Sequence, residues 1–170
     1  MNALASKFGD GFSILAFPCN QFGHQTQEDN SEILSMLKHV RPGGGFTPAA
    51  QVTMFEKVNV NGATAHPLFA WLRSQILLPM DSMASVHEAG MPDPLKMVSA
   101  RASDGNSTLV LWTPVTRSDI AWNFEKFLID GDGMCVKRYS QFYPTIDIAA
   151  DIEKLLQADE AEGVVKPTTP

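Results

Sequence analysis

The sequence has 170 residues, of which 44% are hydrophobic and 19% are charged, and its net charge is −6. This length suits a single domain with a sizeable core, and the acidic balance without a basic run argues against a nucleic acid partner. No apolar segment reaches the length that crosses a bilayer, so we also expect no membrane partner. The start of the chain has no signal-peptide pattern, and the two cysteines, Cys19 and Cys135, give no disulfide framework, so the expected compartment is cytoplasmic.

Helices and strands alternate in the first half of the chain. The short apolar run FSILAF is typical of a strand that is covered on both faces. Asp29 and Glu32 have the spacing of a capping box, and Pro67 suits the first turn of a helix. The predicted elements are a helix over 1–8, a strand over 12–17, a helix over 29–40, a strand over 54–60, a turn at 61–62 and a helix over 66–75.

The second half begins with a long excursion over 77–106, and loops of that size usually carry function or an interface. The elements predicted after it are a strand over 122–130, a DGDG turn, a strand over 134–139 and a helix over 148–156. This order predicts an α/β fold in one domain over 1–157, followed by a disordered polar tail over 158–170. The hairpin and final helix match the C-terminal half of a thioredoxin-like sandwich, whereas the first half lacks that fold's opening strand and helix.

Three segments together resemble the glutathione peroxidases: FPCNQFGHQ, VRPGGGF and AWNFEKFL, joined by NVNGATAHPLFAWL. The likeness extends from residue 1 to about residue 156, with the segments in the family's order and spacing. The glycine run and the long excursion resemble the tetrameric, selenocysteine-type branch rather than the monomeric, phospholipid-acting branch. The resemblance implies a thioredoxin-like three-layer α/β/α sandwich, a homotetramer, and reduction of peroxides by a thiol such as glutathione, without a bound cofactor.

Peroxide reduction of this kind needs a deprotonated sulfur or selenium as the nucleophile, and its anion needs stabilisation. Side-chain N–H donors of amides and indoles stabilise such an anion without adding a titratable charge. The resemblance assigns this role to Gln21, Trp122 and Asn123. It also matches Arg41 to an arginine that binds the glutathione carboxylate; the alternative is a cation that interacts with the dipole at the end of a helix.

No segment resembles the NVASxCG motif in which the family places its nucleophile, and residue 1 aligns within the helix that follows that motif. We therefore expect an N-terminally truncated chain that lacks the nucleophile and a central strand and has little or no peroxidase activity. A selenocysteine codon interpreted as a stop, followed by a restart at an internal methionine, is our hypothesis for the truncation. Cys19 is expected to accompany the nucleophile rather than replace it, and Cys135 to pack in a strand.

Several alternatives remain open. Gln141, Phe142 and Asp29 stand where members of the branch often have basic residues, so a thioredoxin-type reductant is an alternative to glutathione. The histidines His24 and His66 have no ligand partners at suitable spacing, and no metal site is predicted. A glycosylation sequon, NST at 106–108, makes secretion the alternative compartment. The alternative function is a non-catalytic scaffold or interaction protein that retains the fold.

Overall fold

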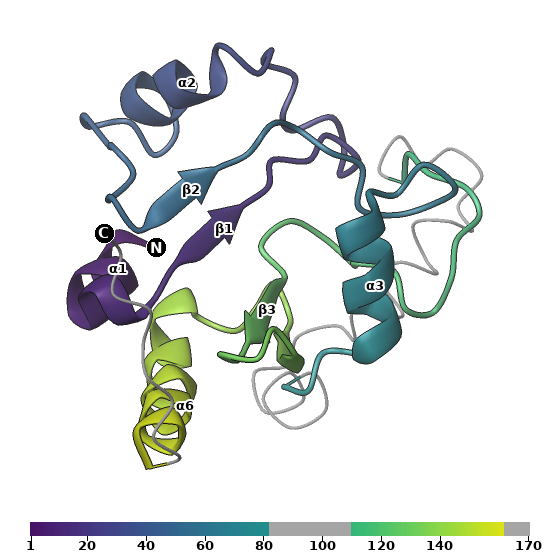
Figure 1. The fold of residues 1–170 in the computed structure, drawn as a ribbon. Helices are drawn as coiled ribbons and strands as arrows, with labels where there is room; N and C mark the ends of the chain where they lie inside the picture. Colours follow the sequence, from purple (N-terminus) through teal and green to yellow (C-terminus); the bar gives the residue numbers. More distant parts are fainter. Residues whose placement is uncertain (82–109, 162–170) are drawn as a thin grey trace.

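The computed structural model describes residues 1–81 and 110–161 (Figure 1). Its helices are α1 (Asn2–Phe8), α2 (Ile33–His39), α3 (Pro67–Gln75) and α6 (Ala149–Ala161), with short 3-10 helices η1 (Gly9–Gly11) and η2 (Thr145–Ile148). Its strands are β1 (Ile14–Ala16), β2 (Val52–Met54), β3 (Lys126–Ile129) and β4 (Cys135–Tyr139). The mixture of helices and strands confirms the predicted α/β class.

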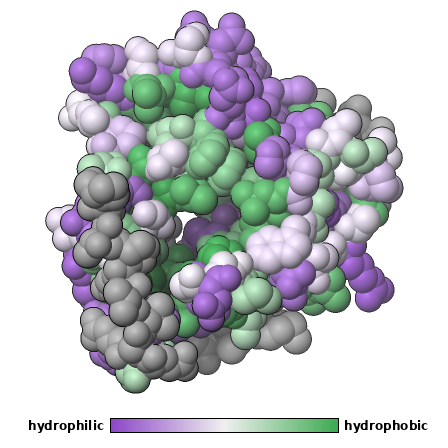
Figure 2. Space-filling model, in the orientation of Figure 1, coloured by the Kyte–Doolittle hydropathy of each residue, from purple (hydrophilic) through white to green (hydrophobic). Residues whose placement is uncertain are grey.

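The strands form two separate pairs. β1 pairs with β2 in parallel, and β3 pairs with β4 antiparallel. Within the described residues no ladder joins one pair to the other. Figure 2 shows the face of the molecule hollowed at its centre, with hydrophobic residues around the opening, and in Figure 1 this place lies between β1 and β3. Leu15, the middle residue of β1, is 56% exposed.

The first half of the chain differs from the prediction at element boundaries. β1 covers three of the six residues of the predicted strand. α2 begins at Ile33 rather than at residue 29, and only one bond of the predicted capping box forms, from the Asp29 N–H to Glu32 Oε2 at 3.0 Å. The N-terminal turn over 30–32 is therefore outside the helix.

The predicted strand over 54–60 is wrong, because β2 ends where that strand was expected to begin. The N–H groups of Lys57, Val58 and Val60 find acceptors outside a strand ladder. Val58 donates to the Pro18 carbonyl at 3.0 Å, Lys57 to Asn30 Oδ1 at 3.0 Å and Val60 to Gln21 Oε1 at 2.8 Å. Loop carbonyls and side-chain amides thus replace the neighbouring strand, and no periodicity of the segment itself indicates this.

The second half agrees with the prediction more closely. The hairpin is confirmed, although β3 begins at Lys126 and not at residue 122. α3 is confirmed with Pro67 at its start, and His66 caps it by accepting the Leu68 N–H at 3.2 Å. α6 continues to Ala161, four residues past the predicted end of the domain. Most of the predicted excursion, the NST sequon and the last nine residues lie outside the described residues.

Two hydrophobic clusters form the core. The first surrounds α3 and contains the buried Phe22, Val60, Phe69, Leu72 and Ile120 together with Cys19. The second lies under α6 and contains Leu4, Leu128, Tyr139, Ile148 and Ile152. Adjacent residues of β3 serve both, since Phe127 packs on the first cluster and Leu128 belongs to the second. None of the described helices is long and apolar enough to span a membrane.

Candidate active site

Gln21 lies in the loop after β1 and is buried, with 5% of its surface exposed. Its Oε1 accepts the backbone N–H groups of Val60 at 2.8 Å and Asn61 at 3.0 Å, and its Nε2 donates to the Asn61 carbonyl at 3.0 Å. Two backbone donors on one oxygen fix which end of the amide is Oε1. Nε2 carries two hydrogens, and its bond to a described residue uses one of them.

A depression of about 430 Å³ lies beside Gln21. Its other lining residues are Ala63, Thr64, Leu111, Trp112 and Thr113. Gln21, which carries an amide N–H donor, therefore lines a space that a small polar ligand can enter.

Trp122 is half-buried and lies next to the Gln21 loop. Its ring centroid is 5.6 Å from that of Phe22, the residue directly after Gln21. Phe22 also contacts Trp112, which lines the depression, at 5.6 Å. The structure thus brings Trp122 into the neighbourhood of Gln21 through a shared aromatic contact.

Asn123 and Arg41 meet at a residue that the sequence analysis did not single out, Gln25. Asn123 Nδ2 donates to Gln25 Oε1 at 2.8 Å, and Arg41 Nη2 donates to the Gln25 carbonyl at 3.3 Å. Both contacts are exposed to solvent. All four predicted site residues therefore belong to the loop over 17–25 or contact one of its residues.

Backbone strain flanks the contact between Asn123 and Gln25. His24, directly before Gln25, has φ 52°, and Phe124, directly after Asn123, has φ 65°. They are the two non-glycine residues with positive φ in the described part of the chain. Such left-handed conformations cost energy for residues with a Cβ and gather at functional sites.

Two further residues of the site were missed by the sequence analysis. Asn61, which was interpreted only as part of a turn, links Gln21 to Ile120 and is fully buried. Asp119 is buried and accepts hydrogen bonds from Trp112 Nε1 at 2.7 Å and from Arg73. The partners of Asn61 lie 40 and 59 residues away along the chain, and Arg73 lies 46 residues from Asp119, so no local pattern predicts these pairs.

The two cysteines lie in surroundings that disfavour a thiolate. Burial raises the pKa of Cys19, whose Sγ contacts Gln21 Oε1 at 3.7 Å. Burial also raises the pKa of Cys135 on β4, and the two thiols form no disulfide. Among the described residues, no group of three or more histidine, cysteine or acidic side chains is arranged to bind a metal.

Comparison with known proteins adds sequence relatives and two structures. Residues 1–73 match the family model for glutathione peroxidase. Glutathione peroxidase 1 of Macaca fuscata fuscata is 50% identical over 157 residues, which cover 92% of this chain and 69% of that protein. Glutathione peroxidase 1 of Sus scrofa is 48% identical over 164 residues, which cover 96% of this chain and 70% of that protein. The crystal structure of Trgpx in apo form is 23% identical with a TM-score of 0.47, covering 92% of this chain and 65% of that chain. The crystal structure of T. cruzi GPX1 is 22% identical with a TM-score of 0.45, and the match covers 91% of this chain and 67% of that chain.

Proposed function

Because the chain belongs to the glutathione peroxidase family, we propose that Gln21, Trp122 and Asn123 are the N–H donors of a thiol-dependent peroxidase centre. The resemblance noted in the sequence motifs is confirmed, and with it the thioredoxin-like fold class. The observation that carries the proposal is the fixed orientation of the amide of Gln21, a residue that lines the depression.

The chemistry is a two-electron transfer from a sulfur or selenium anion to a peroxide. The anion attacks one peroxide oxygen, the O–O bond breaks, and the other oxygen leaves as hydroxide, which takes up a proton. The nucleophile becomes a sulfenic or selenenic acid, and two thiols reduce it again with release of water. Preorganised N–H donors stabilise both the attacking anion and the leaving hydroxide, which is the role of Gln21, Trp122 and Asn123.

The nucleophile is proposed to come from outside these 170 residues. Cys19 and Cys135 are the two cysteines of the sequence, and burial raises the pKa of each. A protonated thiol is a poor nucleophile, so neither suits the attack on a peroxide. We therefore expect the 170-residue chain to consume peroxide no faster than the uncatalysed reaction.

A stopped-flow assay with hydrogen peroxide and glutathione, repeated with a thioredoxin-type reductant, tests this expectation. Turnover by the chain that Cys19→Ser abolishes would contradict it and would make Cys19 the nucleophile. Turnover that survives in both Cys19→Ser and Cys135→Ser would indicate chemistry of another class.

The donor role is tested on a chain that also carries the proposed nucleophile. There Gln21→Ala is expected to lower kcat/KM by about 100-fold or more, as for other preorganised donors to an anion. Gln75→Ala is the matched control, because Gln75 lies exposed at the end of α3 with its amide on Ser74. Equal activity of the two variants would refute the donor role of Gln21.

The finer assignments are proposals of the same kind. Arg41 is proposed to bind a carboxylate of glutathione, which serves as a co-substrate, and no bound cofactor is required.

We propose a homotetramer in the cytoplasm, testable by light scattering and by fractionation of cells. Glycosylation at Asn106 or export would favour secretion, and a thioredoxin-type reductant stays the alternative to glutathione. A non-catalytic scaffold or interaction protein that retains the fold stays the alternative function.

A further inference from the structure

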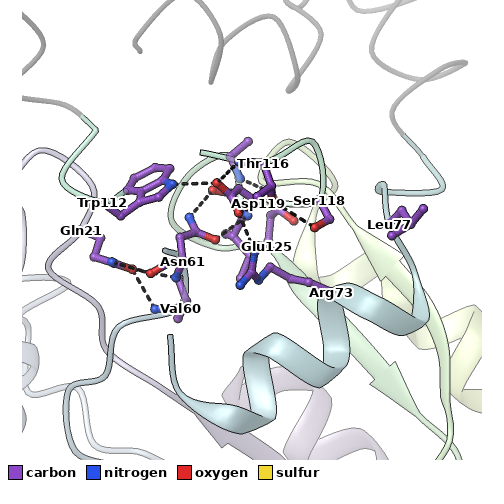
Figure 3. A network of polar contacts seen from close by, with 12 residues as sticks. Gln21, Val60, Asn61, Arg73, Leu77, Trp112, Thr116, Ser118, Asp119 and Glu125 are labelled. Atoms are coloured by element: carbon purple, nitrogen blue, oxygen red, sulfur yellow. Dashed lines mark hydrogen bonds and ion pairs between the residues drawn. The ribbon is translucent and has the colours of Figure 1, made fainter. Parts of the chain in front are cut away.

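Asn61 lies between Gln21 and the segment that leads into Trp122 (Figure 3), and it is fully buried. Its side-chain Nδ2 donates to the Ile120 carbonyl and its Oδ1 accepts the Ile120 N–H, both at 2.9 Å. Its backbone N–H donates to Gln21 Oε1 and its carbonyl accepts from Gln21 Nε2, both at 3.0 Å. We call these four hydrogen bonds the Asn61 bridge.

The side chain of Asn61 acts on Ile120 as a neighbouring peptide would. A primary amide offers one donor and one acceptor side by side, and this pair matches the N–H and C=O of a single residue. Alanine at position 61 would leave the N–H and C=O groups of Ile120 without these two hydrogen bonds, and an unpaired buried polar group destabilises the fold. Aspartate would retain the acceptor and lose the donor.

The segment 119–121 is fixed by neighbours on its other sides as well. The Ala121 N–H donates to the buried Glu125 carboxylate, and the Asp119 carbonyl accepts from Arg138 Nη2 at 3.0 Å. The Asp119 carboxylate accepts from Arg73, Trp112 and Thr116 (Figure 3). Trp122 and Asn123 therefore follow a stretch of backbone that is fixed on several sides, and Asn61 links this stretch to Gln21.

We propose that Asn61 is a positioning residue, which sets the separation between the Gln21 amide and the Trp122–Asn123 pair. The inference rests on the proposed function for what the site does. The geometry itself does not depend on turnover, so it is tested by a readout that needs no peroxide.

The test is the pH dependence of Asn61→Asp, followed by the indole N–H resonances of the 15N-labelled chain. The sequence has three tryptophans, and Trp122→Phe assigns the signal of Trp122. Near neutral pH the introduced carboxylate cannot donate to the Ile120 carbonyl, so the Trp122 signal is expected to shift from its wild-type position. Once the pH falls below the pKa of that carboxyl, the protonated acid has a donor and an acceptor, and the signal should return.

Asn59→Asp is the matched control, because Asn59 is exposed and its amide contacts only Thr64 among its described hydrogen bonds. It should leave the Trp122 signal unchanged at each pH. A Trp122 signal that ignores Asn61→Asp at every pH would overturn the inference.

A measurement on the wild-type chain keeps the inference falsifiable even if the variant does not fold. The side-chain amide hydrogens of Asn61 should exchange slowly with water and show nuclear Overhauser contacts to the Ile120 N–H. Fast exchange without that contact would refute the Asn61 bridge. A chain that meets these expectations, but shows no peroxide turnover when it also carries the proposed nucleophile, would refute the proposed function and leave the bridge intact.

Discussion

Phe124 follows Asn123 directly and is the most exposed of the large hydrophobic residues described, at 80%. Its φ of 65° lies in the left-handed region, where a Cβ meets the following carbonyl oxygen. Little burial compensates for this strain, so its role is to direct the chain from Asn123 into β3. The neighbouring Asn123 amide thereby reaches Gln25.

Replacing Phe124 by glycine and by alanine separates the strain from the aromatic ring. Both variants remove the exposed ring, but only glycine adopts positive φ without steric cost. We expect Phe124→Gly to be more stable than Phe124→Ala by about 1 kcal/mol in urea denaturation. Equal stability of the two variants would show that the backbone at this position is not strained.

At the scale of elements, β4 and α6 are joined by the carboxylate of Asp151. It accepts hydrogen bonds from Lys137 Nζ at 2.8 Å and from the Tyr139 hydroxyl at 2.9 Å. The bond from Lys137 is the main cause that lowers the pKa of Asp151 below its usual value, against the opposite effect of burial. Because the charged form is favoured in the folded state, this contact stabilises the fold above the usual pKa of 3.8.

The stabilisation by Asp151 should be lost as the pH falls below 3.8 and through the lowered pKa of the folded state. In Asp151→Asn this loss is absent, so the difference in unfolding free energy between wild type and variant should shrink on acidification. Thermal unfolding monitored by circular dichroism from pH 6 down to the acid limit of the fold measures it. A constant difference across that range would contradict the assignment.

The elements that the sequence predicts best are those whose signals are local. The hairpin turn at Asp130 and the proline at the start of α3 act on the backbone of their own segment. The strand predicted over 54–60 failed because its partners are Pro18, Asn30 and Gln21, which lie far away in the sequence. Short apolar runs do not distinguish a strand from an extended loop that finds such acceptors.

The residues of the candidate site also differ in whether local sequence predicts them. Gln21, Trp122, Asn123 and Arg41 were named through motifs, and the structure places them along one loop. Gln25 and Asn61, which connect them, lie in the quoted segments FPCNQFGHQ and NVNGATAHPLFAWL, but no site role was predicted for either. Asn61 in particular has the local signal of a turn, and its pairing with Ile120 depends on tertiary structure.

At the scale of the whole molecule, Arg138 connects the hairpin to the region of α3. Its side chain is fully buried and pairs with the buried carboxylate of Glu125 at 2.7 Å. It also donates to the carbonyls of Ile76, Leu77 and Ser118 at 2.9–3.1 Å. Burial is the main influence on Glu125, and it raises the pKa of that carboxyl despite the opposing charge of Arg138.

Removing the guanidinium should therefore affect the entire fold. We expect Arg138→Met to lower the unfolding free energy by about 3 kcal/mol or more, because a buried carboxylate loses its partner. Lys137→Met, on the same strand and partly exposed, should cost about 1 kcal/mol or less. Urea denaturation of the three proteins decides this, and similar midpoints for both variants would contradict the role of Arg138.

The hydrogen bonds of the candidate site join residues that are remote in the chain. Gln21 and Asn61 are 40 residues apart, Asn61 and Ile120 are 59 apart, and Gln25 and Asn123 are 98 apart. Closing loops of this length costs chain entropy before any contact compensates for it. We therefore expect the site to form late in folding, after the local helices and the hairpin. Partial unfolding, by the same reasoning, removes the site first and leaves those local elements in place.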